Sequence, residues 1–199
     1  MDEIAVLTAE VLQIVLTRLL QNKAVRLFTL LKIPCFKPLL TGNIMDKITI
    51  RTATHSDLGT LLEFEQGIIQ TERPFDHTLK EGLIHYYDLE AMIDAEDVLL
   101  LVAECNGELA GSGYARIEDV KNYLKHPQHA YLGFMYVKPA FRAMGVNQMI
   151  MEGLKQWCRE RNITEMRLEV YDENVGAIRA YEKTGFKRIL TWMRLGLDD

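Results

Sequence analysis

The sequence lacks features that identify several classes of protein. It has no basic excess: 23 Lys and Arg stand against 28 Asp and Glu, which gives a formal net charge of −5. This balance argues against a nucleic-acid-binding protein, because such proteins normally present a basic face. Its three cysteines, Cys35, Cys105 and Cys158, are odd in number and lack metal-ligand spacing. They are typical of free thiols in a reducing compartment, so we expect a cytoplasmic protein.

Long apolar runs are also missing. No stretch of about 18 uncharged apolar residues occurs, so we expect no membrane span. The acidic start at Asp2 and Glu3 argues against a secretory leader. His126 and His129 flank Pro127, but no third ligand is placed to form a metal site. We therefore expect no metal and interpret both histidines as solvated loop residues.

Residues 1–44 differ from the rest of the chain. Apolar residues recur there at roughly helical spacing among charged ones, at Leu12, Leu16, Leu19 and Leu20. The pattern predicts an N-terminal helical extension. This extension is either dispensable or serves a homodimer or attachment to a membrane surface. Residues 45–199 are long enough for one domain with its own core.

The order of elements after residue 47 mixes strands and helices. Alternating or apolar runs predict strands at residues 48–52, 98–103, 109–117 and 131–137, with a hairpin turn at Asn106 and Gly107. Helical patterns cover residues 57–72, 79–93 and 147–161. Two further strands, at residues 166–171 and 186–195, are expected to complete the sheet.

A tight loop joins one of these strands to a helix. The loop runs from Arg142 to Asn147 and contains Gly145. The first turn of a helix leaves N–H groups without intrahelical partners, and the peptide dipoles place partial positive charge there. Such a terminus suits a phosphate, and Arg142 adds a fork of donors.

A second helix begins at Asn174 and stops at Gly185. Asn174, Ile178 and Tyr181 lie at i, i+4 and i+7, so they share one helical face. Asparagine is a preferred helix N-cap. Its place on this helical face is compatible with two roles for Tyr181: a packing residue of the core or a functional residue.

Together the two segments resemble the GNAT superfamily of N-acetyltransferases. Residues 142–147 look like its Arg/Gln-x-x-Gly-x-Gly/Ala pyrophosphate loop, and residues 174–186 are similar to its C-terminal acetyl-CoA motif. The resemblance extends from about residue 48 to the end of the sequence. It implies an α/β fold with a mixed, strongly twisted β-sheet flanked by helices.

The resemblance also implies a cofactor site. Acetyl-CoA would be the co-substrate, with its pantetheine arm along a strand and its pyrophosphate on backbone N–H groups. The residues that would bind it are Met135, Tyr136, Val137, Arg142, Ala143, Met144, Gly145, Val146, Asn147 and Asn174. Tyr181 would be the general acid for the leaving sulfur.

The acceptor implied by the family is a primary amine of a small molecule or peptide. Residues that would border it are Glu72, Arg73, Phe75, Asp76 and Tyr114. A guanidinium at Arg73 would suit an acceptor that carries a carboxylate.

Two positions depart from the family pattern. Gly133 stands near where many relatives carry a general-base Glu, so the base is open among groups near Glu65, Glu72 and Tyr114. Asn147 replaces a small residue close to the pyrophosphate, where we expect it to be accommodated. These departures keep an alternative open, in which the chain is a catalytically inactive acyl-CoA-binding sensor.

Overall fold

The computed structural model describes residues 48–197. The predicted N-terminal extension lies outside the described residues. None of the helices in residues 48–197 has the length and apolar character needed to cross a membrane.

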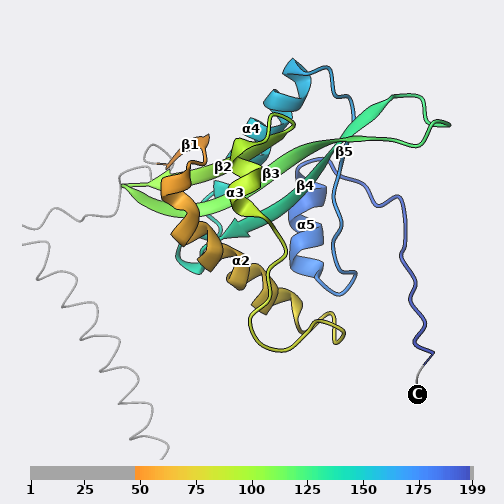
Figure 1. Ribbon diagram of the computed structural model, residues 1–199, viewed down its shortest axis with the longest axis horizontal. Coiled ribbons are helices and arrows are strands. Elements are labelled where there is room, and N and C mark those ends of the chain that lie inside the picture. Colours follow the sequence, from red (N-terminus) through yellow and green to blue (C-terminus); the bar gives the residue numbers. More distant parts are fainter. Residues whose placement is uncertain (1–47, 198–199) are drawn as a thin grey trace, which may run out of the picture. The chain divides into compact units, whose positions relative to one another are not determined.

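A five-stranded mixed sheet organises the described chain (Figure 1). Its strands lie in sequence order: β1 (Ile48–Thr52), β2 (Val98–Cys105), β3 (Glu108–Asp119), β4 (Gln128–Val137) and β5 (Met166–Arg167). The first four pair antiparallel, and β5 pairs parallel to β4. The α/β fold expected from the sequence is therefore confirmed.

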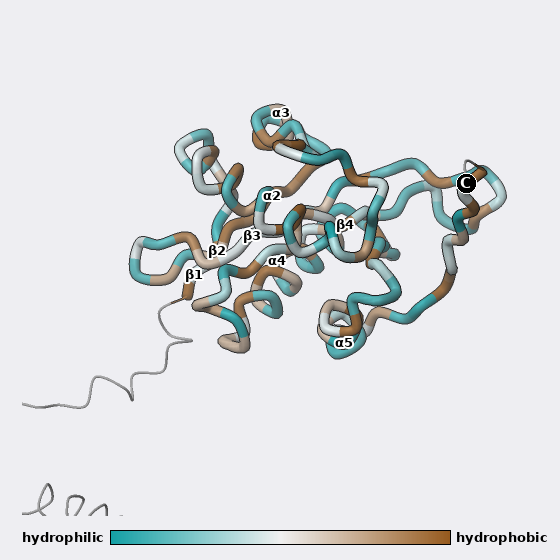
Figure 2. The backbone as a smooth tube through the Cα atoms, turned by 90° about the horizontal axis from the view of Figure 1, so that it is seen from below, coloured by the Kyte–Doolittle hydropathy of each residue, from teal (hydrophilic) through white to brown (hydrophobic). Residues whose placement is uncertain are grey.

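Helices cover both faces of the sheet (Figure 2). The helices α2 (Leu58–Glu72) and α3 (Leu89–Asp94) share one apolar cluster with Leu100 and Val102 of β2. The helix α4 (Val146–Glu160) shares the other cluster with Leu101 and Ala103, and Tyr181 of α5 (Val175–Lys183) packs against it. Successive residues of a strand face opposite sides, so an apolar run in β2 serves both cores.

The hairpin turn lies where the sequence predicts it. Asn106 and Gly107 have φ values of 53° and 82°, as a two-residue hairpin requires. Two short 3-10 turns, η2 (His55–Asp57) and η3 (Pro139–Phe141), precede α2 and the loop before α4. Helix α2 begins at Leu58, after a turn in which the Thr54 N–H donates to the Asp57 carboxylate at 2.8 Å.

The predicted helix over residues 79–93 is wrong, because only Leu89–Asp94 is helical. The preceding segment gives its backbone N–H groups to a distant side chain instead. Tyr86 N and Tyr87 N donate to Glu65 Oε1 of α2 at 2.7 and 2.9 Å. Asp88 then caps the short helix by accepting a hydrogen bond from Ala91 N.

The predictions for the last two strands are also wrong: the first is shorter than expected, and the second does not form. Only Met166 and Arg167 pair with β4, and residues 168–171 continue without strand pairing. Residues 187–197 form neither helix nor strand. The interpretation of His129 as a solvated loop residue is corrected too, since it lies in β4 with 7% of its surface exposed.

Candidate functional site

The candidate functional site lies where β4 and β5 separate. Their pairing ends at Ala130↔Met166 and Tyr131↔Arg167, so within residues 48–197 no strand continues along the edge of β4 from residue 132 to 137. A β-bulge bends β4 at this point: the register against β3 shifts between Ser112 and Tyr114, and Phe134 has a φ of 53°. The result is an open strand edge with free backbone groups.

Polar side chains hold the bulge in place. Ser112 Oγ, which is fully buried, donates to the Phe134 carbonyl at 3.0 Å. The Phe134 N–H donates to Tyr87 Oη at 3.3 Å. A residue of the loop before α3 therefore fixes the backbone at the opening, because an N–H freed by the bulge needs a partner.

The open edge runs directly into the N-terminus of α4. Gly145 is the N-cap residue with a φ of 84°, and Ala143 also has a positive φ of 63°. No side chain caps α4, so the first-turn N–H groups remain available to an anion. Asn147 is half-buried in this first turn, and Arg142 Nε donates to the Val137 carbonyl at 3.3 Å.

Helix α5 borders the separation from the other side. The predicted cap is confirmed: Asn174 Oδ1 accepts from Ala177 N at 3.1 Å. Tyr181 packs edge-on against Phe186, with ring centroids 6.1 Å apart. Burial, with a smaller contribution from the charge of Glu72, raises the pKa of Tyr181 to about 12.

Glu72, the last residue of α2, is the carboxylate of this region. Burial raises its pKa above the ordinary 4.5, the neighbouring Tyr86 hydroxyl opposes this rise, and the nearby Asp76 adds to it. Burial also raises the pKa values of Tyr86, Tyr87 and Tyr171, and the charge of Glu72 adds a smaller contribution. Glu72 therefore lies among phenols and close to Tyr181, in a setting that disfavours a bare negative charge.

Tyr86 presents an unusual hydroxyl. Its Oη atom is buried and has no hydrogen-bond partner among the described residues. Burial raises the pKa of Tyr86, and its interaction with the neighbouring Glu72 raises it further, although the two side chains do not meet the geometry of a hydrogen bond. A buried hydroxyl without a partner is costly, so this atom is available to a polar group of a ligand.

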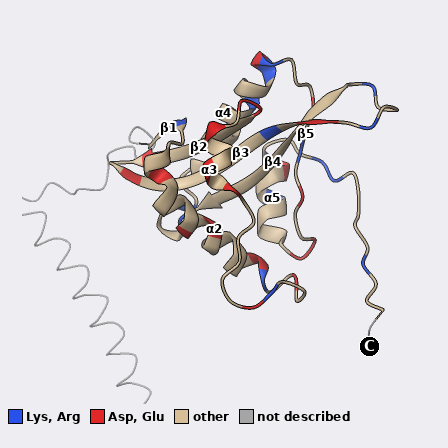
Figure 3. Cartoon of the chain, viewed as in Figure 1, with Lys and Arg blue, Asp and Glu red and all other residues tan. Residues whose placement is uncertain are grey.

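Asp76 joins three segments at the rim of the region. Its carboxylate accepts from the Tyr171 hydroxyl at 3.2 Å, from the Thr78 hydroxyl at 2.6 Å and from both terminal nitrogens of Arg194. Phe75 packs against the Tyr171 ring at 6.0 Å. Acidic and basic side chains mix along this loop (Figure 3).

The Arg73 guanidinium is bonded within its own loop. Its two terminal nitrogens donate to the carbonyls of Lys80 and Gly82 at 2.7 and 2.6 Å. These bonds close the loop that follows α2. The guanidinium is thus engaged within its own loop, and no observation favours its pairing with a substrate carboxylate.

Tyr114 explains the missing carboxylate on β4. It is buried on β3 opposite Gly133, and a Cβ atom at Gly133 would lie 2.6 Å from its Oη and 2.7 Å from its ring. The ring occupies the space that a Glu at position 133 would need. Tyr87 packs on the same ring edge-on, at 5.7 Å.

Glu65 is a buried side chain that stabilises the backbone carrying Tyr86 and Tyr87. It is fully buried on α2, and its second oxygen lies 2.6 Å from His85 Nδ1. The sequence suggests Glu65 only as a group near the base. The signal in the sequence for this supporting role was the position of Glu65 among the core residues Leu61, Phe64 and Ile68.

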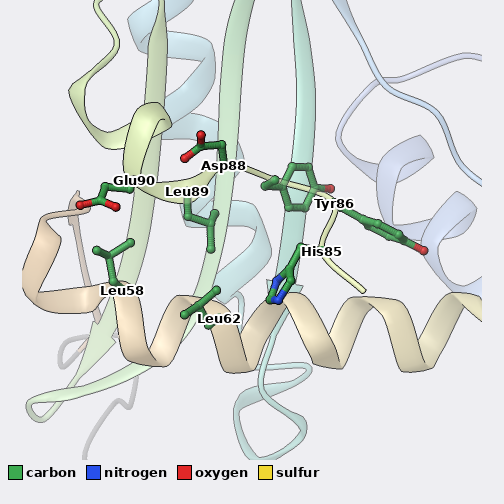
Figure 4. A pocket seen from close by; sticks show the side chains of 8 residues that line it. Leu58, Leu62, His85, Tyr86, Asp88, Leu89 and Glu90 are labelled. Atoms are coloured by element: carbon green, nitrogen blue, oxygen red, sulfur yellow. The ribbon is translucent and has the colours of Figure 1, made fainter. Parts of the chain in front are cut away.

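A pocket adjoins this region (Figure 4). Leu58 and Leu62 of α2 face Leu89 and His85 across it, whereas Tyr86 points away from Leu58 toward the side that carries α5. Tyr86 and Tyr87 line the pocket as well, so these two residues connect it to the opening between β4 and β5.

Comparison with known proteins identifies this arrangement. The Acetyltransferase (GNAT) family matches residues 66–186, which is more than half of the chain. The chain belongs to the GNAT family. The GNAT match includes the end of α2, the bulged β4, the loop before α4 and the start of the segment after α5.

Individual relatives agree with the GNAT assignment. An acetyltransferase of Pectobacterium atrosepticum, ECA0875, is 29% identical over 102 residues, which are 51% of this chain and 67% of that protein. A predicted acetyltransferase from Clostridium acetobutylicum, solved with acetyl-CoA, has 19% identity and a TM-score of 0.58 over 75% of this chain and 96% of its own. Glucosamine-6-phosphate N-acetyltransferase from Arabidopsis thaliana has 20% identity and a TM-score of 0.57 over 76% and 99%. At these identities the two structures support the GNAT fold.

Proposed function

We propose that the chain transfers an acetyl group from acetyl-CoA to a primary amine of a small molecule or peptide. The observation that carries this proposal is the free edge of β4, which leads into the uncapped N-terminus of α4. Membership of the GNAT family supports it, and so does a structural relative that was solved with acetyl-CoA.

The cofactor would follow this path. Pantetheine is a chain of amides, so it binds as an added strand along residues 132–137. The pyrophosphate is held by backbone N–H groups from Ala143 to Asn147 at the positive end of α4. The free, buried Cys105 and Cys158 are compatible with a reducing compartment such as the cytoplasm.

Glu72 would take the proton of the attacking amine. An amine nitrogen attacks the thioester carbonyl as its free base, so the proton of the ammonium form must leave. A carboxylate with a raised pKa is better matched to this task than an ordinary one. The unpartnered hydroxyl of Tyr86 offers the same amine a hydrogen-bond acceptor.

Tyr181 would act on the leaving group, which is the sulfur of acetyl-CoA. After the new C–N bond has formed, the nitrogen gives up one more proton. When the C–S bond breaks, the electron pair stays on sulfur as a thiolate, which takes up that proton to leave as the free thiol. The Tyr181 hydroxyl stabilises the thiolate charge by donating a hydrogen bond. The hydrogen-bond donor and the base thus lie on α5 and α2, on either side of the opening.

One observation favours a second candidate, a catalytically inactive acyl-CoA-binding sensor. The Tyr114 ring fills the place of a general base on β4. Such a module would bind acetyl-CoA and release no thiol with any amine.

The test is a panel of primary amines with acetyl-CoA, followed by free-thiol release. We expect turnover with at least one cationic amine. Glu72→Gln should lower kcat/KM about 10²- to 10⁴-fold, the range of general-base catalysis, while acetyl-CoA affinity is unchanged. Glu63→Gln, on an exposed position of the same helix, is the matched control and should behave as wild type. Acetyl-CoA binding without turnover across the panel would favour the sensor.

The pH profile adds a sharper test of Glu72. Only the ionised carboxylate accepts a proton, so activity should fall as the pH drops through the pKa of Glu72. Because that pKa is raised, the midpoint of this acid limb should lie above 4.5. An acid limb that persists unchanged in Glu72→Gln would assign the base to another group.

A further inference from the structure

A row of four tyrosines lies beside the opening between β4 and β5. We call it the tyrosine row, and it consists of Tyr86, Tyr87, Tyr114 and Tyr131. The first two rings meet edge-on with centroids 6.0 Å apart, and the second and third do the same at 5.7 Å. The guanidinium of Arg116 lies 5.8 and 5.9 Å from the ring centroids of Tyr114 and Tyr131, so these two rings are neighbours as well.

A carboxylate lies at each end of the tyrosine row. Glu72 is the neighbour of Tyr86, as described above. At the other end, Tyr131 pairs with Arg167 in the register of β4 and β5, and counting on in that register matches Glu169 to Gly133. Burial raises the pKa of Tyr131, and the charge of Glu169 is the next cause, as expected for a carboxylate beside this hydroxyl.

Neither of these two carboxylates forms an ion pair within residues 48–197. The arginines of this region bind other acidic residues: Arg116 binds Glu118, Arg167 binds Glu165, and Arg194 binds Asp76. Arg73 is bonded to carbonyls of its own loop. The tyrosine row therefore has uncompensated negative charge at both ends, which attracts a ligand with positive charge.

The hydroxyl of Tyr86 points independently to a ligand with hydrogen-bond donors. Its Oη atom is buried without a partner among the described residues, and the side chain points toward the side that carries α5 (Figure 4). An ammonium group has three donors and no acceptor. One ammonium group at this end can therefore bond the Glu72 carboxylate and the Tyr86 oxygen together.

We propose that the tyrosine row binds a small-molecule acceptor with two ammonium groups, one at Glu72 and the other at Glu169. This inference rests on the proposed acetyl transfer, because Glu72 receives the amine that reacts. Glu169 and the Tyr131 hydroxyl hold the second ammonium group, which does not react. The carbon chain between the two charges lies against the tyrosine rings, which offer a large apolar surface.

The charges predict an order of preference among acceptors. A diamine compensates both carboxylates, whereas a monoamine of the same length compensates only Glu72. An amino acid brings its own carboxylate toward Glu169, where like charges repel. The acceptor with a carboxylate, which the sequence suggested through Arg73, is therefore the least favoured of the three.

Glu169 determines specificity in this proposal and takes no part in bond making or breaking. Its side chain is exposed, so the effect of its charge is modest. Glu169→Gln should raise the KM of a diamine about 2- to 5-fold, the range of one exposed ion pair, and leave kcat unchanged. Glu169→Lys replaces attraction by repulsion, which doubles the free-energy change and predicts up to about 30-fold.

The test compares straight-chain diamines with monoamines and ω-amino acids of the same chain length, at saturating acetyl-CoA. We expect wild type to have its highest kcat/KM with diamines, and Glu169→Gln to leave the constants for monoamines unchanged. Glu169→Lys should favour ω-amino acids over diamines. Glu173→Gln removes one exposed negative charge from the same segment and is the matched control. Added salt should weaken the preference for diamines in wild type and have less effect in Glu169→Gln.

A binding experiment separates this inference from acetyl transfer itself. With CoA in place of acetyl-CoA no transfer takes place, and calorimetry measures the Kd of the acceptor alone. A diamine should bind more tightly than the monoamine, and Glu169→Gln should remove the difference. This result without turnover of any amine would refute acetyl transfer and still support the site for two charges.

Three results would overturn the inference. One is equal KM and Kd for diamines and monoamines in wild type. Another is an unchanged preference for diamines in Glu169→Lys, with circular dichroism and thermal melting showing that the variant is folded. The last is a lower kcat with monoamines in Glu169→Gln, which would make Glu169 part of the chemistry.

Discussion

Tyr181→Phe is the most direct test of the chemistry, because it removes one hydroxyl and keeps the ring. The Tyr181 ring packs against Phe186 and the core beside α4, and a phenylalanine retains those contacts. The fold and the affinity for acetyl-CoA should therefore be preserved. Any loss would fall on the step in which the hydroxyl takes part.

The size of the loss follows from the pKa of the hydroxyl. Burial raises the pKa of Tyr181 to about 12, whereas a free thiol titrates near 8.5. Complete proton transfer from this phenol to a thiolate would be unfavourable by about 3.5 pKa units, or about 5 kcal/mol. Tyr181 therefore acts as a hydrogen-bond donor to the developing thiolate. A hydrogen bond to a charged group contributes about 1.5–3 kcal/mol, which predicts a fall in kcat of about 10- to 150-fold.

Single-turnover thiol release is the appropriate assay, because slow product release could conceal the change in steady state. Calorimetry should give an unchanged Kd for acetyl-CoA. The ratio of wild-type to variant rates should stay constant up to about pH 10, since a group of pKa about 12 does not titrate below it. Tyr123→Phe, at an exposed position, is the control.

Three outcomes would refute this reasoning. Wild-type turnover in Tyr181→Phe would make the residue a packing residue only. A weaker Kd that accounts for the whole loss would assign it to cofactor binding. A rate ratio that changes between pH 7 and 9 would show that the hydroxyl titrates far below 12.

Two further predictions concern the cofactor and the stability of the fold. Gly145→Glu should abolish acetyl-CoA binding measured by calorimetry, because a charged L-residue is strained at a φ of 84° and repels the pyrophosphate; Gly59→Glu, in open space on α2, should bind normally. Asp57→Asn should lower the free energy of unfolding at pH 7 by about 2 kcal/mol in urea titrations, since the bond from Arg51 lowers the pKa of Asp57 from 3.8 to about 2. A lowered pKa stabilises the fold above pH 3.8 and loses this effect as the pH falls toward 2, so the two proteins should converge in acid; a gap that persists at pH 2 would contradict the ion-pair explanation.

Local patterns predicted most of the sheet, the loop before α4 and the cap of α5. β1 spans the predicted residues 48–52, and the Asn106–Gly107 turn and the Asn174 cap have the predicted geometry. These features depend on residues close in sequence. The loop before α4 was found in the same way, since its glycine and the following helix are adjacent in the chain.

The region around Glu72 and Asp76 depends on contacts between distant residues, which periodicity does not reveal. Glu65 accepts hydrogen bonds from the N–H groups of Tyr86 and Tyr87, 21 and 22 residues away, where a long helix is expected. Asp76 binds Arg194, 118 residues away. Each of these partners is an ordinary charged residue in the sequence.

The close fit of Tyr114 over Gly133 restricts how this protein can change. A Glu at position 133 would collide with the Tyr114 ring, whose atoms lie 2.6–2.7 Å from the first side-chain carbon. Shrinking Tyr114 first would leave a cavity beneath Tyr87. Either substitution alone should therefore lower the stability of the fold. A carboxylate at position 133 calls for a smaller side chain at position 114, so this one packing contact couples the two positions.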